Sequence, residues 1–528
     1  MTQRLKNYLF CFILVVFSIN SIYADSIVSF ADLNYHSDFE KETFFKLENT
    51  FQPDYFALFL AADKNVKAAE YETYKSALEL AVAAFKNEKF AKYNDKKKVK
   101  KIYNSVHASM LDKYVIKANF SQLFTAKEYQ CVTSTMLFAL VFNELNIPYE
   151  IEFQPNHVFL IAYPSTSKII VQTTNPQKGV FVYDNTFKNN YVNYLRDNKL
   201  ISKDEFDNKS LDDLFTEYYL KTKVGDLKQL AGSQYFNLGL DFLTQNKVKQ
   251  ALNNFTKAYY LDASLQNKFL MTASLGLMID KTNATDPDYY KYLGMFTRTS
   301  SKDVKKDIFI SLFYDMTQRQ LNFEGNVDMY KRSYQYLMDK VKDSTLKSEF
   351  SFIYNFEMGR KMINNLHYNE SLTFLENAYK IKPDNVDIQN MLVATVVSLN
   401  SKSFYDENRL NILNDTLDNF VKSHINLKDN DKIINLMYMV KLGLMSNYYY
   451  KGEIQKAEHF QNEFESLCNE NSNKVIYESY SNIEKSYSAA AAYYFKKGKY
   501  GKARELLNKG LVYIPDSYQL KARLKALN

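Results

Sequence analysis

One pattern of large and small residues recurs along the C-terminal part of this chain, and no other feature constrains the fold as strongly. Its first copy reads Tyr235-x2-Leu238-Gly239-x2-Phe242, then Ala251-x3-Phe255-x2-Ala258. Apolar residues at these offsets share one face of a helix, and small residues among them let a second helix approach closely. The pattern therefore predicts a hairpin of two packed helices.

Two further copies keep these offsets. The second spans Met358 to Pro383 and the third spans Tyr487 to Pro515, and each ends in the proline that stops its second helix. The pattern resembles the tetratricopeptide repeat, whose unit is about 34 residues long. The gaps leave room for more degenerate units, and Tyr438 to Phe464 is one candidate. The resemblance implies an all-α solenoid of tetratricopeptide-like hairpins over residues 226–528.

Composition predicts a chain that is mostly helical overall. Only 13 Gly and 8 Pro occur among 528 residues, which is too few for a turn-rich all-β protein. This length predicts more than one domain. Residues 25–225 differ from the repeats, because apolar residues at helical spacing fill 44–60, 68–90 and 99–114. The basic run that begins at Lys96 is expected to be the solvated start of the last of these helices.

Short runs rich in β-branched and aromatic residues follow these helices, and turn-forming residues separate the runs. They cover residues 148–153, 157–163, 168–174 and 180–186. An antiparallel meander is the natural interpretation of four such runs in succession. We therefore expect residues 25–225 to form an α+β domain.

The first residues have the layout of a secretory signal peptide. Arg4 and Lys6 precede an apolar stretch from Tyr8 to Ile19, and Ala24 supplies a small residue at the expected cleavage site. The stretch is shorter than the roughly 20 residues that span a bilayer, and no later segment comes close. We expect residues 1–24 to be removed and the mature protein to be soluble, periplasmic or secreted, with no integral membrane segment.

Charge and cysteine content exclude two further classes of protein. The net charge of +7, of which Arg4 and Lys6 supply two, is too weak to imply a nucleic-acid partner. Without the leader only Cys131 and Cys468 remain, so the chain is no disulfide scaffold, and we expect the two not to pair. Cys468 is interpreted as a small buried hydrophobe. Cys131 is a candidate nucleophile, because an unpaired cysteine in an exported protein suggests a reactive thiol.

Cys131 stands at the start of an amphipathic helix. Met136, Leu137 and Leu140 share one face of this helix, and Cys131 falls at or just before its N-terminus. Backbone N–H groups at a helix N-terminus stabilise a thiolate, so we expect the pKa of Cys131 to be lowered. His157 opens a predicted strand 26 residues later. A Cys on a helix and a His on a strand are the pair that attack on an amide carbonyl needs.

These residues resemble the transglutaminase-like superfamily of the papain-like cysteine fold. The family pattern is a Cys that opens a helix, an Ile-Pro loop, a His that opens a strand and an acid before Thr on the next strand. Cys131, Ile147-Pro148 and His157 match the first three parts, and Gln172 stands in the place of the acid. The resemblance implies that Cys131 is the nucleophile and His157 the base. Gln172 would orient the imidazole without supplying the charge of an acid.

Asn175 is a second candidate for the orienting role. If Tyr163 pairs with Lys168 across the turn, Gln172 lies opposite Phe159, on the sheet face that carries His157. Asn175 then points to the other face. Gln172 is favoured, and a one-residue bulge would reverse the choice.

Two functions remain open from the sequence. The first is thiol-dependent amide hydrolysis or acyl transfer on a peptide or protein recruited by the repeats, with the backbone N–H of Cys131 on the oxyanion. The second is a non-catalytic transglutaminase-like binding module on a repeat scaffold, a protein-interaction adaptor, which the missing acid favours. No cofactor or metal is implied, because the glycine-poor chain has no phosphate-binding loop and its other histidines show no metal-ligand spacing.

Overall fold

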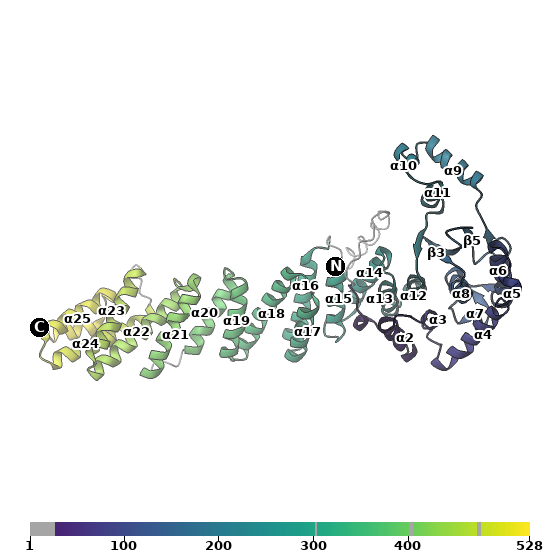
Figure 1. The fold of residues 1–528 in the computed structure, drawn as a ribbon. Helices are drawn as coiled ribbons and strands as arrows, with labels where there is room; N and C mark the ends of the chain where they lie inside the picture. The colour runs from purple at the N-terminus through teal and green to yellow at the C-terminus, as the bar shows by residue number, and fades with distance from the viewer. Residues whose placement is uncertain (1–26, 301–303, 401–405, 472–476, 528) are drawn as a thin grey trace. The chain divides into compact units, whose positions relative to one another are not determined.

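The computed structural model describes residues 27–300, 304–400, 406–471 and 477–527 (Figure 1). It contains 71% helix and 5% strand, which confirms the prediction of a mostly helical chain. The predicted signal peptide, residues 1–24, lies outside the described residues. Within the described ranges no helix has both the length and the apolar character needed to cross a bilayer.

The chain forms two compact units. Unit 1 holds the residues up to Asn283 together with Met295–Asp303, and unit 2 holds Ala284–Gly294 together with Val304–Asn528. The boundary that we expected at residue 225 therefore falls inside unit 1. The first hairpin after residue 225 packs on the N-terminal elements of unit 1, for the reason given below.

The N-terminal helices of unit 1 match the helical stretches of the sequence, although the two longest stretches are each interrupted. Pro53 separates α2 from α3, because proline cannot continue a helix. Val99, Ile102 and Val106 of α6 are buried, and most of the lysines around them are exposed, as expected. These helices are α2 (Asp38–Asn49), α3 (Tyr55–Leu60), α4 (Tyr71–Ala83), α5 (Glu88–Ala91) and α6 (Asp95–Met110).

A five-stranded antiparallel sheet with the strand order β6-β5-β4-β3-β7 follows α8. The predicted meander is confirmed, and its last strand is short because the Asp184 side chain accepts the N–H of Phe187 and starts α9. The sheet and the preceding short elements are β1 (Lys113–Tyr114), α7 (Gln122–Thr125), β2 (Glu128–Tyr129), α8 (Cys131–Glu144), β3 (Tyr149–Gln154), β4 (His157–Ala162), β5 (Ile169–Val171), β6 (Val180–Phe181) and β7 (Lys223–Gly225).

A small helical lobe connects β6 to β7. Its own core includes Val192, Leu195 and Phe215. The lobe consists of α9 (Asn185–Asp197), α10 (Lys203–Asn208), α11 (Leu211–Phe215) and the π-helical turn η3 (Thr216–Leu220).

The first predicted hairpin is formed by α12 (Leu227–Thr244) and α13 (Val248–Leu261), followed by α14 (Leu265–Lys281). A Cβ on Gly239 would lie 2.6 Å from the ring of Phe255, so only glycine lets the two helices pack this closely. Ala251 and Ala258 have no exposed surface. The small residues of the sequence pattern are therefore packing positions, as predicted.

A buried ion pair joins this hairpin to α2. The Lys257 ammonium lies 2.6 Å from Glu40, and the Tyr235 hydroxyl donates to the same carboxylate at 2.9 Å. Burial alone would raise the pKa of Glu40, but the hydrogen bonds and charges of His36 and Lys257 hold it below its usual value. Burial lowers the pKa of Lys257, and Glu40 opposes that effect. The first hairpin is therefore held on the N-terminal part of unit 1.

Unit 2 continues with helix hairpins (Figure 1). The second and third copies of the sequence pattern are the pairs α18 with α19 and α24 with α25, and α22 pairs with α23 as predicted. Gly359 packs against Leu375 in the same way that Gly239 packs against Phe255. The helices after α14 are α15 (Tyr289–Thr299), α16 (Lys306–Thr317), η4 (Gln318–Phe323), α17 (Val327–Lys340), α18 (Ser344–Asn364), α19 (Tyr368–Ile381), α20 (Val386–Asn400), α21 (Glu407–Ser423), η5 (Ile425–Leu427), α22 (Asp431–Lys451), α23 (Ile454–Glu470), η6 (Tyr477–Ser479), α24 (Tyr480–Lys496), α25 (Tyr500–Tyr513) and α26 (Tyr518–Lys525).

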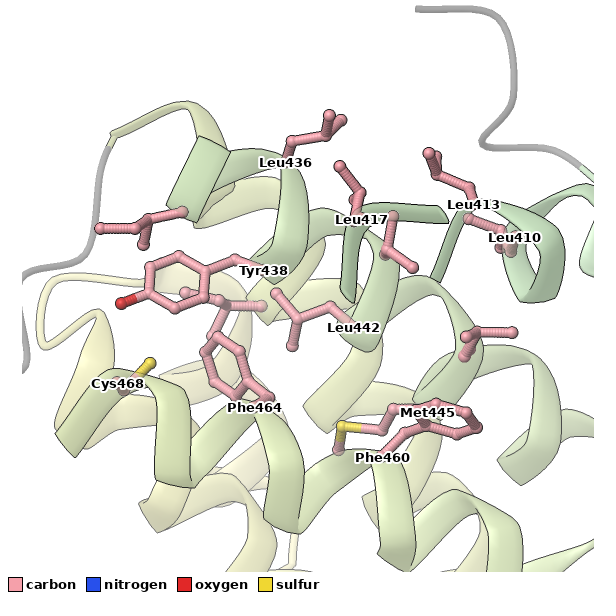
Figure 2. Close-up of a cluster of buried hydrophobic side chains, with 14 of the residues drawn as sticks. Leu410, Leu413, Leu417, Leu436, Tyr438, Leu442, Met445, Phe460, Phe464 and Cys468 are labelled. Atoms are coloured by element: carbon pink, nitrogen blue, oxygen red, sulfur yellow. The ribbon is translucent and has the colours of Figure 1, made fainter. Parts of the chain in front are cut away.

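Figure 2 shows part of the core of unit 2, where side chains from α21, α22 and α23 meet. Cys468 lies in this core beside Tyr438, with 0% of its surface exposed. The prediction that Cys468 is a buried apolar residue is therefore confirmed.

Replacing Ala251 with Leu should destabilise unit 1 by about 1 to 3 kcal/mol, because three extra carbon atoms must fit between packed helices. Urea unfolding followed by circular dichroism measures the change. Gln250→Leu is the matched control, since Gln250 is the exposed neighbour on the same helix. Equal unfolding midpoints for the two variants would show that Ala251 is not at a helix contact.

Replacing Lys257 with Met should cost about 3 to 5 kcal/mol, because it leaves the Glu40 carboxylate buried without its cation. The double variant with Glu40→Leu should recover most of this loss, since it buries no charge. Lys46→Met is the control, because Lys46 and Glu42 form an ion pair on α2 with 62% of each side chain exposed. That pair should be worth about 0.5 kcal/mol or less in the same unfolding measurement.

Candidate active site

Cys131 is the first residue of α8, as predicted. Gln130 caps this helix, since its side-chain oxygen accepts the N–H of Val132 at 3.2 Å and its own N–H donates to Thr133 Oγ1 at 3.0 Å. Gln130 and Thr133 thus form a reciprocal capping box at the start of α8. The cap fixes where the helix begins and therefore where the thiol lies.

Three hydroxyl groups tie the start of α8 to the sheet. Thr173 Oγ1 lies 2.9 Å from Ser134 Oγ and 3.0 Å from Thr135 Oγ1, and the Thr135 hydroxyl donates to the carbonyl of Val158 at 3.3 Å. All three hydroxyl-bearing residues have no exposed surface. The N-terminus of α8 is therefore fixed against the first residues of β4 and the residues that follow β5.

His157 and Gln172 are in direct contact. His157 Nε2 lies 2.6 Å from Gln172 Oε1, and the His157 ring stacks at 6.1 Å on Phe159 of the same strand. Because an amide oxygen only accepts hydrogen bonds, Nε2 carries the proton and Nδ1 is the basic nitrogen. The contact is the one that an orienting residue must make.

The strand register explains why Gln172 makes this contact and Asn175 does not. Leu160 pairs with Val171 and Ile161 with Ile170, which extends to Gln172 opposite Phe159. This is the register expected from the sequence, without a bulge. The Asn175 side chain instead accepts the N–H of Lys178 at 3.0 Å and closes the turn.

The backbone of Gln172 is held on both sides. Its N–H donates to the carbonyl of Gly179 at 2.7 Å, and its carbonyl accepts the Tyr103 hydroxyl at 2.8 Å. A Cβ on Gly179 would lie 2.0 Å from the Tyr103 hydroxyl oxygen, so glycine is required there. Sequence reasoning missed Tyr103, because nothing in its local pattern indicates a contact 69 residues away.

The environment of Cys131 differs from the expectation. Burial raises the pKa of the thiol above its ordinary value, and the backbone N–H groups of Val132, Val158 and Cys131 itself only partly oppose this effect. The predicted lowering at the helix N-terminus is therefore wrong, since desolvation of the thiolate outweighs the N–H groups. Burial thus favours the protonated form of the Cys131 thiol.

The thiol contacts the backbone beside His157 and not its ring. The N–H of Val158, the next residue, faces the sulfur. Of the hydrogen bonds among the described residues, the one made by the thiol is donated to Gln130 Oε1 at 3.6 Å, and none reaches the imidazole. The structure thus brings His157 and Gln172 together and places Cys131 at the adjoining end of β4.

Both cysteines of the described residues are unpaired, as predicted. Cys468 lies in unit 2, where burial raises its pKa to about 12 although the Tyr438 hydroxyl opposes the shift. The two thiols therefore differ strongly in accessibility. Cys131 is the one thiol among the described residues that has partial exposure.

Comparison with known proteins gives no assignment. No protein-family model matches the chain, and no curated protein matches it at a significant level. A proposal for function therefore depends on the arrangement of Cys131, His157 and Gln172.

Iodoacetamide should modify Cys131 and leave Cys468 unmodified in the native protein, because only Cys131 is partly exposed. Peptide mapping by mass spectrometry measures both rates. Since burial raises the pKa of Cys131, its alkylation rate should level off above the roughly 8.5 of a free thiol. In denaturant both thiols should react at similar rates, and native labelling of Cys468 would contradict its burial.

Proposed function

We propose that the protein carries out thiol-dependent amide chemistry of the transglutaminase-like kind, either hydrolysis or acyl transfer, on a peptide or protein. The observation that carries the proposal is the 2.6 Å contact that orients His157 on Gln172 beside the N-terminus of α8, where Cys131 begins the helix. A nucleophile at a helix start, a base on a strand and an amide that orients the base are the parts such chemistry requires.

In the proposed reaction the Cys131 sulfur attacks the substrate carbonyl carbon as its proton passes to His157 Nδ1. The backbone N–H of Cys131 donates to the oxyanion. The C–N bond then breaks, and the amine leaves with the proton from His157. Water or a second amine attacks the resulting thioester and gives its proton to His157. The C–S bond then breaks, and the sulfur takes the proton back from His157, which restores the thiol of Cys131.

The protonated resting thiol gives His157 the role of a general base. Gln172 holds the imidazole by a hydrogen bond and supplies no negative charge, so a standing thiolate–imidazolium pair is not favoured before substrate binds. Proton transfer then accompanies the attack on the carbonyl. This arrangement favours slower chemistry than an acid in place of Gln172 would allow.

The proposal includes export and recruitment. The charged, apolar and small-residue pattern of residues 1–24 supports export to the periplasm or beyond the cell. The helix hairpins that resemble tetratricopeptide repeats suit the binding of a peptide or protein partner, which would bring the acyl donor to Cys131.

A non-catalytic adaptor is the second candidate. It is favoured by the amide in place of an acid at Gln172 and by the thiol bonding to Gln130 and not to His157. In this case the Cys131 region serves as a binding module, and thiol chemistry plays no part.

Trapping of the acyl-enzyme separates the two functions. The protein is incubated with synthetic peptides that contain Gln, Asn and internal peptide bonds, together with hydroxylamine as the acceptor. We expect hydroxamate or cleaved peptide to form and an acyl adduct to map to Cys131 by mass spectrometry. Cys131→Ala and His157→Ala should abolish the product, and Cys468→Ala should retain it. No product and no adduct with any peptide class would leave the adaptor as the function.

Gln172→Glu should lower the pH at which Cys131 alkylation levels off, because a carboxylate beside His157 stabilises the imidazolium and so the thiolate. The replacement is of equal size and keeps an acceptor oxygen at the ring. The same change should raise the rate of product formation. In His157→Ala the Gln172→Glu substitution should have no effect, and an equal shift with and without the imidazole would contradict the role given to His157.

A further inference from the structure

Three side-chain amides form a chain that leads from the first repeat helix to the thiol. Gln130 Nε2 donates to Gln234 Oε1 at 3.1 Å, and Gln234 Nε2 donates to Asn119 Oδ1 at 3.1 Å. Gln130 and Gln234 are 3% and 2% exposed, so neither amide has water as an alternative partner. Gln234 belongs to α12, whereas Gln130 caps α8.

Contacts at both ends of the Gln130 amide fix which end faces the sulfur: the N–H of Val132 donates to its oxygen, and its nitrogen donates to Gln234. An amide has one accepting and one donating end, and each link here uses the donor of one residue on the acceptor of the next. Gln234 Nε2 donates to Asn119 Oδ1, which leaves Gln234 Oε1 to accept the donor end of Gln130. The remaining end of Gln130, its oxygen, accepts both the thiol of Cys131 and the N–H of Val132.

We propose that Gln234 of the first hairpin is a positioning residue for Cys131, which acts through Gln130 to keep the thiol hydrogen-bonded and protonated. The oxygen of Gln130 favours the S–H form because it accepts its hydrogen. A thiolate would face the same electron-rich oxygen and would be disfavoured. The first repeat hairpin thus restrains the thiol, and the catalytic meaning of this restraint rests on the proposed function.

Titratable groups on other elements also face the thiol. Tyr114 on β1 is close enough that charge on Cys131 raises its pKa, after burial as the larger cause, and its ring packs on Tyr129 at 5.8 Å. His157 lies on β4. None of these groups belongs to the chain of three amides, so their effects are the same in variants that alter only Gln234.

The position of Gln234 links the restraint to the hairpin as a whole. The next residue, Tyr235, is bonded to Glu40 and packs against Lys257, so α12 is held in place by buried contacts. Because α12 is held in this way, Gln234 keeps a constant position beside Gln130.

Two replacements of Gln234 test the proposal. Gln234→Met has a similar length and no amide acceptor, so only the N–H of Val132 still orients Gln130, and Cys131 alkylation should level off at a pH lower by about 0.5 unit or more. Gln234→Glu loses the donor to Asn119 but keeps an acceptor for Gln130 Nε2, so it should show an unchanged or higher value. Iodoacetamide labelling of the full chain, read at Cys131 by mass spectrometry across pH, is the measurement, and thermal unfolding checks the fold.

Opposite behaviour of the two variants supports the proposal. The proposal would be overturned if the pH at which alkylation levels off were unchanged in both variants or lowered equally in both. A general loosening of α12 would affect the two variants alike. If Gln234→Met does not fold, Asn119→Leu removes the group that orients Gln234 from a partly exposed position and should shift the profile in the same direction. The pH dependence of Cys131 alkylation can be measured without catalytic turnover. It therefore tests the role of Gln234 even if the acyl-enzyme test fails.

Discussion

The buried pair of Glu40 and Lys257 is the interaction on which the arrangement of unit 1 depends. Removal of two charges from water is costly, and the pair is tolerated because each charge meets its opposite and Tyr235 adds a hydrogen bond. Since Glu40 lies on α2 and Lys257 on α13, the pair anchors the first hairpin on the N-terminal part of the chain. This placement is what brings α12 against α8 and puts Gln234 within hydrogen-bond distance of Gln130.

The candidate site lies where α8 meets the ends of two strands, and neutral hydrogen bonds that are buried or partly buried hold its parts. The hydroxyl of Thr173 is hydrogen-bonded to Ser134 at the start of α8, and the hydroxyl of Tyr103 donates to the residues that follow β5. Such contacts fix backbone positions more tightly than a surface ion pair would, because they lack solvent as a competitor. Gln172 can therefore orient His157 without the help of a charge.

The sequence predicted those features that depend on periodicity and local chemistry. The hairpin of α12 and α13, the meander and the pairing that places Gln172 opposite Phe159 all follow from spacing that is visible in the chain. The contacts of Tyr103 and Gln234 were not predictable, because they join residues far apart in sequence through side chains with no distinctive pattern. The prediction that the pKa of Cys131 is lowered was wrong for a similar reason. The helix N-terminus is a local feature that the sequence shows, whereas the burial that raises the pKa depends on the whole fold.

The groups that orient Cys131 and His157 are amides, and this has a consequence for the solution in which the protein works. Dissolved ions screen pairs of charges, but they act weakly on hydrogen bonds between neutral groups in a water-poor interior. An acid in place of Gln172 would make the state of the imidazole depend on a charge pair and so, at a partly open site, on ionic strength. With Gln172 no charge pair is needed to hold the ring, so the orientation of His157 depends less on ionic strength.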